Sequence, residues 1–338
     1  MESSHIFFLI SQLHHNRLTF NIHHLALSPL QPLSPFQPFR MSTKSISIVT
    51  FFFSVWTMST ATAQDPTDLY LFQLHRADDY TYHIYDAKFL SGFNKGGYTN
   101  QPWFTPSGDL LVSVRKPGGE QNDIYQLSLT TRKIKRLTQT KANEYSPRIH
   151  PDGKQLTVVR QLQGDSIDQQ VFQSSLQGGG YRSLTPQIKD IGYYTWTAKD
   201  QLALFRIDGE ENHLASLNLT DGRTRRITSS VGRTLLSDGA GAIVYVHKYT
   251  DDYWYIKKYN PASLVIDIIL QTPGKSEDFT IAPDGTYFMG VGSKLYCFHP
   301  AHHTSWQEVG DLSVHGIKQI SRLAVSPDGK GLALVSTK

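Results

Sequence analysis

The sequence predicts an all-β fold, a six-bladed β-propeller, from a recurring turn signal, four short strands per repeat and one repeat divided between the chain ends. The turn signal reads Pro-Ser-Gly or Pro-Asp-Gly, or is degenerate, at residues 106–108, 151–153, 198–200, 238–239, 283–285 and 327–329. Proline fixes φ at the second position of a turn and glycine tolerates positive φ, so each copy predicts a tight hairpin turn. The copies recur about every 45 residues, which is typical of propeller blades.

Each turn is followed by a strand in which apolar residues predominate. These second strands cover residues 110–114, 156–159, 202–205, 243–246, 287–289 and 332–335. A third strand follows, as at 124–127, and a fourth ends on segments such as Arg136-Leu137-Thr138. No segment between the strands has a helical period, so the repeat unit is predicted to be a four-stranded blade with short connections.

The two ends of the chain are predicted to share one blade. The last repeat, residues 320–337, stops after two strands, and residues 68–72 and 82–90 supply a third and an outer strand. Pairing of N-terminal with C-terminal strands in one blade closes the ring and removes the free sheet edges. Five complete units and one shared unit therefore predict six blades over residues 64–338.

Residues 41–63 predict a cleavable signal peptide that starts at Met41. Lys44 supplies the positive charge, residues 46–56 form an apolar run, and Ala61-Thr62-Ala63 supply the small residues of a cleavage site. The apolar run is too short to span a bilayer, so we expect a secreted protein and not a membrane-spanning one.

Residues 1–40 have two interpretations. They are rich in histidine and carry a proline at every third position over 29–38, which is typical of a polyproline arm or a metal-binding histidine tract. The favoured interpretation is an upstream start codon, with Met41 as the true initiator, because a secretory signal acts at the N-terminus. Residues 1–40 are therefore expected to be a non-native or disordered extension.

The cysteine count and the net charge indicate the cellular compartment and the class of partner. Cys297 is the only cysteine, so the chain forms no intrachain disulfide, and a secreted protein of this kind is held by its core alone. This favours a bacterial periplasm over the extracellular space of an animal. The net charge of +4 gives no sign of nucleic-acid binding.

The repeat resembles that of the TolB-type, WD-like propeller family. Residues 326–336 match its Ser-Pro-Asp-Gly-Lys core and following apolar strand almost throughout, and residues 150–154 match it closely. The resemblance covers the whole predicted mature chain, with two blades degenerate at the turn, and without the N-terminal domain of TolB. It implies a stand-alone propeller in the cell envelope that binds a protein or a small ligand, and it implies no catalytic residues.

Basic residues end the second strands of four consecutive predicted blades. They are Arg115, Arg160, Arg206 and His247, at positions where the TolB-type repeat usually has serine. The loops after the second strands share one rim of a propeller with the loops that enter the inner strands. We hypothesise that the three arginines converge and bind an anionic ligand or an acidic partner surface, because a guanidinium forms two parallel bonds with a carboxylate.

The same rim carries acids, tyrosines and further arginines where the chain enters the inner strands. These candidates are Asn143, Glu144, Tyr145, Tyr193, Tyr194, Arg233, Glu277, Asp278 and Arg322. The favoured alternative to ligand binding is that each rim arginine pairs with a neighbouring acid and joins blades to one another. The tyrosines are candidates for stacking on a sugar or a peptide, with blade-to-blade packing as the alternative.

Catalytic signatures in the sequence are weak. No Gly-x-Ser-x-Gly motif is present, and no catalytic residue, metal site or cofactor is predicted. The alternative function is a metal-dependent lyase or hydrolase in the channel, in which His213, His247 and His315 would join the rim acids. Nothing in their spacing brings these residues together. We therefore expect a monomeric binding or scaffolding propeller whose partner is a protein or an anionic small molecule.

Overall fold

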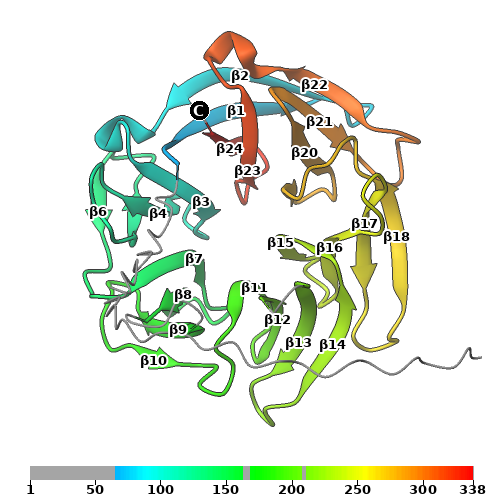
Figure 1. Cartoon of the computed structure of the whole chain (residues 1–338). Coiled ribbons are helices and arrows are strands. Elements are labelled where there is room, and N and C mark those ends of the chain that lie inside the picture. Colours follow the sequence, from blue (N-terminus) through cyan, green and yellow to red (C-terminus); the bar gives the residue numbers. More distant parts are fainter. Residues whose placement is uncertain (1–64, 163–167, 208–210, 338) are drawn as a thin grey trace, which may run out of the picture. The chain divides into compact units, whose positions relative to one another are not determined.

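The computed structural model describes residues 65–162, 168–207 and 211–337, and the predicted signal peptide and N-terminal extension lie outside these residues. The described residues form six four-stranded sheets that are arranged in a ring (Figure 1). Their helical elements are two short 3-10 turns, η1 (Ser91–Asn94) and η2 (Leu312–His315). The predicted all-β, six-bladed propeller is thereby confirmed. None of these residues builds a helix that is both long and apolar enough to cross a membrane.

Each blade runs from an inner strand at the channel to an outer strand, and takes its name from the inner strand. The β3 blade consists of β3 (Tyr98–Phe104), β4 (Leu110–Arg115), β5 (Asp123–Leu127) and β6 (Ile134–Arg136). The β7 blade consists of β7 (Asn143–Ile149), β8 (Gln155–Gln161), β9 (Gln169–Ser175) and β10 (Arg182–Ser183). The β11 blade consists of β11 (Ile191–Ala198), β12 (Gln201–Arg206), β13 (His213–Asn218) and β14 (Thr224–Ser229).

The remaining blades complete the ring. The β15 blade consists of β15 (Val231–Ser237), β16 (Ile243–Lys248), β17 (Trp254–Tyr259) and β18 (Ile266–Gln271). The β19 blade consists of β19 (Phe279–Ile281), β20 (Tyr287–Val291), β21 (Lys294–Phe298) and β22 (Gln307–Asp311). The sixth, which we call the closing blade, consists of β23 (Gln319–Val325), β24 (Gly331–Thr337), β1 (Thr67–Arg76) and β2 (Tyr82–Phe89).

The closing blade joins the two ends of the propeller. β1 pairs antiparallel with β24, in a register that runs from Thr67 opposite Thr337 to Gln73 opposite Gly331. Figure 1 shows the blue β1 beside the red β24. The blade shared between the chain ends, which the sequence predicted, is confirmed. Neither strand is left with a free edge on this side, so the ring is closed by backbone hydrogen bonds.

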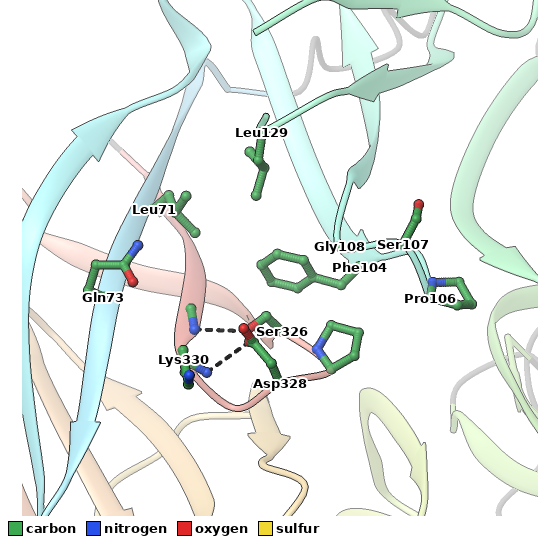
Figure 2. Close-up of a pocket in the computed structure, with 12 residues that line it drawn as sticks. Leu71, Gln73, Phe104, Pro106, Ser107, Gly108, Leu129, Ser326, Asp328 and Lys330 are labelled. Carbon is green, nitrogen blue, oxygen red and sulfur yellow. Dashed lines mark hydrogen bonds between the residues drawn. The ribbon is translucent and has the colours of Figure 1, made fainter. Parts of the chain in front are cut away.

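The Pro-Asp-Gly turns connect the inner strand of a blade to its second strand. Gly153 and Gly329 have φ of 73° and 72°, in the left-handed region that residues with a side chain rarely adopt. In the turn of the closing blade, the Asp328 carboxylate accepts a hydrogen bond from the Lys330 backbone N–H at 3.0 Å (Figure 2). A cleft of about 290 Å³ lies between this turn and residues 106–108 of the β3 blade. These turns form the face opposite the rim, which we call the turn face.

The hydrophobic core lies between neighbouring blades. Leu334 of β24 and Phe288 of β20 are fully buried in a cluster that joins the closing blade to the β19 blade. Side chains alternate along a strand, so the next residue, Val335, packs with Leu110 against the β3 blade instead. Cys297 belongs to the first cluster, and burial raises the pKa of its thiol to about 11, as for a structural core cysteine.

Truncation of Leu334 to alanine tests the packing of the closing blade. The side chain is 0% exposed, and its removal leaves a cavity that is expected to lower the free energy of unfolding by about 2–5 kcal/mol in urea denaturation. Val314→Ala is the control, because Val314 is 81% exposed and its loss is expected to cost no more than about 0.5 kcal/mol. Equally small effects of both substitutions would contradict a packed closing blade.

Candidate functional site

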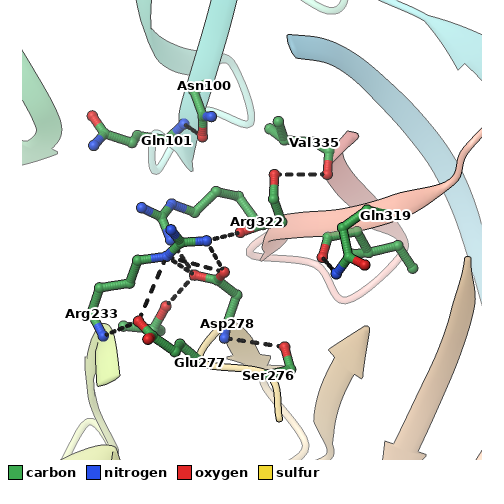
Figure 3. Close-up of polar contacts among 12 residues, drawn as sticks. Asn100, Gln101, Arg233, Ser276, Glu277, Asp278, Gln319, Arg322 and Val335 are labelled. Atoms are coloured by element: carbon green, nitrogen blue, oxygen red, sulfur yellow. Dashed lines mark hydrogen bonds and ion pairs between the residues drawn. The ribbon is translucent and has the colours of Figure 1, made fainter. Parts of the chain in front are cut away.

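Four blades bring charged and aromatic side chains together in the channel. Tyr193 lies on β11, Arg233 on β15 and Arg322 on β23, and Asp278 immediately precedes β19. We call these four residues the channel cluster, and Figure 3 shows the two arginines around Asp278. All four were predicted as rim candidates, and their side chains contact one another although their strands belong to different sheets.

Asp278 is the centre of the channel cluster. Arg233 donates to its carboxylate from Nη2 at 2.5 Å and from Nε at 3.2 Å. Arg322 donates to the same carboxylate from Nη1, and to the Tyr193 hydroxyl from Nη2 at 3.1 Å. The Arg322 guanidinium also lies over the Tyr193 ring, 5.1 Å from its centroid, within the range of a cation–π contact. One carboxylate thus holds two guanidinium groups from different blades.

The Asp278 carboxylate and the Arg322 guanidinium are both charged at neutral pH. Burial by itself raises the pKa of the Asp278 carboxyl. The charge of Arg322 and the hydrogen bonds from Arg233 outweigh burial and hold the pKa of Asp278 below its usual range. Burial lowers the pKa of Arg322, but Asp278 more than reverses this effect. Two guanidinium groups thus share one buried carboxylate, and a second acid, Glu277, lies 3.9 Å from Arg233 Nε.

Glu277 extends the channel cluster toward the rim. Its Oε2 accepts a hydrogen bond from the Arg233 backbone N–H at 3.1 Å, and its Oε1 contacts Lys248 Nζ. Thr234 Oγ1 donates to Asp278 Oδ1 at 3.0 Å. The β15 blade is therefore bonded to both acids that precede β19. Lys248 was not among the predicted rim candidates, although it ends a second strand next to the candidate His247.

The β3 and β7 blades are joined across the channel by a side chain and a backbone group. Gln101 and Ser146 have φ of 54° and 51°, values that non-glycine residues adopt infrequently. Each lies at an irregularity in the pairing of its inner strand with the second strand. Gln101 Oε1 accepts a hydrogen bond from the Ser146 backbone N–H at 2.7 Å. The irregular backbone at these positions therefore serves a contact between blades.

Arg160 and Arg206 are held within their own blades. Arg160 donates from Nε to Glu144 Oε1 at 3.3 Å, and its guanidinium lies 4.3 Å from the centroid of the Tyr181 ring. Arg206 binds Asp190, in the loop before β11, through two bonds of 2.8 and 2.9 Å. Each arginine thus pairs with a neighbouring acid, as in the alternative to ligand binding, but both pairs lie within one blade and do not join blades to one another. Asp190 was missed by the sequence analysis, although it lies in a loop that enters an inner strand.

Arg115 and His247 also contact neighbours in their own blades. The Arg115 guanidinium lies 5.9 Å from the centroid of the Tyr98 ring of β3. His247 Nδ1 lies 2.8 Å from Lys257 Nζ of the adjacent strand β17. Burial and the charge of Lys257 lower the pKa of His247. A neutral imidazole at this position is therefore favoured at neutral pH.

The other rim candidates bond to residues of the framework. The Tyr194 side chain is buried, and its hydroxyl donates to Thr157 Oγ1 of the neighbouring β7 blade at 2.7 Å. Asn143 Oδ1 accepts a hydrogen bond from the Asn122 backbone N–H at 2.8 Å. The Tyr145 hydroxyl accepts one from Asn122 Nδ2 at 2.9 Å. Tyr194 thus packs between blades, whereas Asn143 and Tyr145 fix the loop before β5.

Glu144 is a fully buried acid near the rim. Burial raises the pKa of its carboxyl to about 7, although a hydrogen bond from Thr140 and the charge of Arg160 act in the opposite direction. Thr138 Oγ1 adds a longer hydrogen bond at 3.3 Å. The group therefore titrates near neutral pH, where an exposed glutamate is fully ionised.

The three histidines considered for a metal-dependent enzyme each have different neighbours. His213 lies opposite Arg206 in the pairing of β12 with β13, and the ring of His315 packs 5.3 Å from that of Phe72. His247 lies beside Lys257. Across residues 65–162, 168–207 and 211–337, no group of three or more His, Cys, Asp or Glu side chains is arranged to hold a metal ion.

An exposed pair of tyrosines lies on the rim of the β15 blade. Tyr249 and Tyr253, in the loop between β16 and β17, are 66% and 54% exposed. A groove of about 740 Å³ beside this loop is lined by residues of the β11 and β15 blades and by Lys275, which precedes β19. These tyrosines were not among the predicted rim candidates, although Tyr249 lies two residues after the candidate His247.

Comparisons with known proteins identify the fold. No family model matches the chain, and a search of curated proteins finds no match. TolB from Acinetobacter baumannii is similar in structure, with a TM-score of 0.51 and 16% identity, over 80% of this chain and 64% of that chain. A protein assigned as TolB from Agrobacterium tumefaciens has a TM-score of 0.60 and 13% identity, over 82% of this chain and 99% of that chain. A protein assigned as a gluconolactonase has a TM-score of 0.55 and 13% identity, over 79% and 98%.

These similarities show a TolB-like six-bladed propeller fold. The chain spans less than two thirds of the length of the Acinetobacter baumannii TolB chain. At 13–16% identity the comparisons concern the fold alone. Because one fold can carry unrelated functions, the function has to be argued from the residues of the site.

Asp278→Asn tests the role of the buried carboxylate. The substitution removes the buried carboxylate that Arg233 and Arg322 share, although Glu277 remains 3.9 Å from Arg233 Nε. It is expected to lower the free energy of unfolding by about 3–5 kcal/mol at pH 7. The pKa of Asp278 is depressed in the folded state, so its stabilising effect is present above the ordinary pKa and disappears as the pH falls below it. Denaturation at pH 7 and pH 3 measures both effects. The exposed Asp267→Asn is the control, and an equal loss in both variants would contradict the assignment.

Glu144→Gln tests the raised pKa of the buried acid. Because its folded pKa of about 7 exceeds the ordinary 4.5, stability from this group is present below pH 4.5 and is lost as the pH rises through 7. The difference in unfolding free energy between wild type and variant is expected to change by about 3 kcal/mol between pH 4 and pH 8, in favour of the variant. Urea denaturation over this range measures the difference, and parallel profiles would show that Glu144 does not titrate there.

Proposed function

We propose that this chain is a non-catalytic, monomeric propeller of the bacterial cell envelope that binds a partner protein at the channel rim. The observation that carries the proposal is the exposure of Tyr249 and Tyr253 on the rim loop of the β15 blade. Tyrosine is enriched among the residues that dominate the binding energy of protein interfaces. Large aromatic side chains that are exposed next to a groove are therefore candidates for the centre of an interface.

The neighbours of Tyr249 hold it in place before any partner binds. The ring of His247 lies 5.9 Å away in an edge-on arrangement, and the ring of Tyr255 lies 6.4 Å away. Lys257 Nζ lies 5.8 Å from the centroid of the Tyr249 ring. Tyr249 nevertheless remains 66% exposed. Restriction of the ring in the free protein lowers the entropy that binding has to remove.

The charges around the groove favour a protein over a small anion at this rim. Lys248 and Lys275 line the groove as cations, and Glu211 and Asp251 line it as anions. A mixed set of charges suits the polar margin of a protein interface, which surrounds an aromatic centre. Arg160 and Arg206, the basic residues first considered for anion binding, already have carboxylate partners.

Location in the envelope rests on the sequence. The predicted signal peptide at residues 41–63 supports secretion, and the TolB-type repeat supports a periplasmic role for the propeller over residues 64–338. The similarity to TolB structures is compatible with a protein-binding role, and the similarity to a protein assigned as a gluconolactonase is compatible with an enzyme. The rim tyrosines favour the first of these.

The combined substitution Tyr249→Ala and Tyr253→Ala tests the proposed interface. Wild-type protein used as bait in a bacterial envelope extract is expected to retain a partner, identified by mass spectrometry, that the double variant binds at least ten-fold more weakly. Loss of a central aromatic residue from an interface costs about 2 kcal/mol or more. Binding of the purified partner to each variant then gives the affinity ratio.

Ile268→Ser is the matched control. Ile268 is 61% exposed on β18, the outer strand of the same blade, so its replacement changes an apolar side chain away from the rim. Retention of the partner by the double variant would contradict the rim interface. A stoichiometric metal ion in protein purified without chelators would favour the lyase or hydrolase alternative.

A further inference from the structure

A second opening of the channel lies on the turn face, opposite the proposed protein interface. A cavity of about 780 Å³ is lined there by the last residues of several inner strands and by the turns that follow them. Its walls include the apolar side chains Trp103, Leu236, Leu323 and Val325. Polar side chains such as Thr280, His299 and Arg148 also line the cavity, and a cavity of this volume with both apolar and polar walls has the size of a small-molecule site.

Arg148 is the only arginine or lysine that lines this cavity. It lies on β7, two residues after Ser146, and also lines a smaller cavity of about 50 Å³ beside the channel cluster. Its guanidinium therefore lies between the two ends of the channel. Its Nη1 donates to the backbone carbonyl of its neighbour Pro147 at 3.0 Å.

No carboxylate of the described ranges forms an ion pair with Arg148. Burial lowers the pKa of its guanidinium, the charge of Arg322 acts in the same direction, and only the Tyr194 hydroxyl opposes them. A guanidinium carries five N–H donors, so most of them remain for another acceptor. Arg148 is partly exposed where it lines the cavity, so an anion that enters the cavity meets a guanidinium that no carboxylate already occupies.

The two acids in the cavity lining are engaged elsewhere. Asp284 accepts hydrogen bonds from Arg76 at 3.1 Å and from the Tyr82 hydroxyl at 2.8 Å. Asp238 Oδ1 accepts two backbone hydrogen bonds within its own turn, at 2.9 and 3.0 Å. The cavity thus combines apolar walls with one cation whose charge no lining acid offsets directly.

We infer that the turn-face cavity binds a small organic carboxylate with an apolar body. The carboxylate accepts hydrogen bonds from the Arg148 guanidinium, and the apolar part packs against Trp103 and Leu323. A planar carboxylate suits the fork of N–H groups on a guanidinium, and the apolar walls discriminate against fully hydrated anions. This site is separate from the rim tyrosines and does not depend on the proposed protein partner.

Calorimetric titration of the full chain tests the inference. The probes are a series of straight-chain and phenyl-substituted carboxylates of four to ten carbon atoms, each paired with its neutral amide, and sodium sulfate. At least one carboxylate is expected to bind ten-fold or more tightly than its amide and than sulfate. If every carboxylate binds no better than its amide, or if sulfate binds best, the inference is overturned.

Arg148→Met and the exposed control Arg225→Gln locate the binding. Arg148→Met is expected to weaken carboxylate binding at least ten-fold and to leave amide binding unchanged, whereas Arg225→Gln changes neither. Because Arg148 has no anion in the free protein, the melting temperature of Arg148→Met is expected to equal or exceed that of wild type by about 2 °C. The assignment would be overturned if Arg148→Met bound carboxylates as tightly as wild type. It would also be overturned if Arg148→Met melted at a lower temperature than wild type and wild type bound acid and amide equally. The Tyr249 and Tyr253 substitutions are expected to leave carboxylate binding unchanged.

Discussion

Backbone pairing between β1 and β24 is the contact on which the rest of the propeller depends. The two strands come from opposite ends of the described chain, and their register places β23 as the inner strand of the closing blade. β23 carries Arg322, which reaches Asp278 before β19 and Tyr193 on β11. A contact between chain ends therefore determines where a charge lies in the channel. Each other blade is formed within one continuous segment, so its own strand order does not rely on this closure.

Polar contacts join different blades across the channel. Asp278 binds two arginines from other blades, and Gln101 links the β3 and β7 blades through a strained backbone position. Removal of ions from water is costly, so such contacts add little net stability compared with well-packed apolar residues. Their geometric requirements are strict, however, because a carboxylate has to meet both guanidinium groups at once. We therefore infer that the channel cluster fixes the positions of the β11, β15, β19 and closing blades relative to one another.

The sequence predicted the blade count, the closure and the rim on which the candidate residues lie, because turn chemistry and strand spacing are local properties. It did not predict which charges pair across the channel, since Arg322 and Tyr193 are distant in the chain and meet only when the ring is closed. Arg148 was missed for a related reason: it follows the rim positions by a few residues and lies deeper in the channel. Arg160 and Arg206 pair with acids of their own blades, whereas the sequence analysis expected ion pairs that join different blades.

The position of Cys297 has a practical consequence for studies of this protein. Its thiol is buried between the β19 blade and the closing blade, and its raised pKa keeps it in the unreactive protonated form at neutral pH. A thiol reagent therefore reaches it only when these two blades separate. As the only cysteine of the chain, it serves as a natural reporter of opening at the seam, and its labelling rate follows the lifetime of the closed ring without any engineered probe.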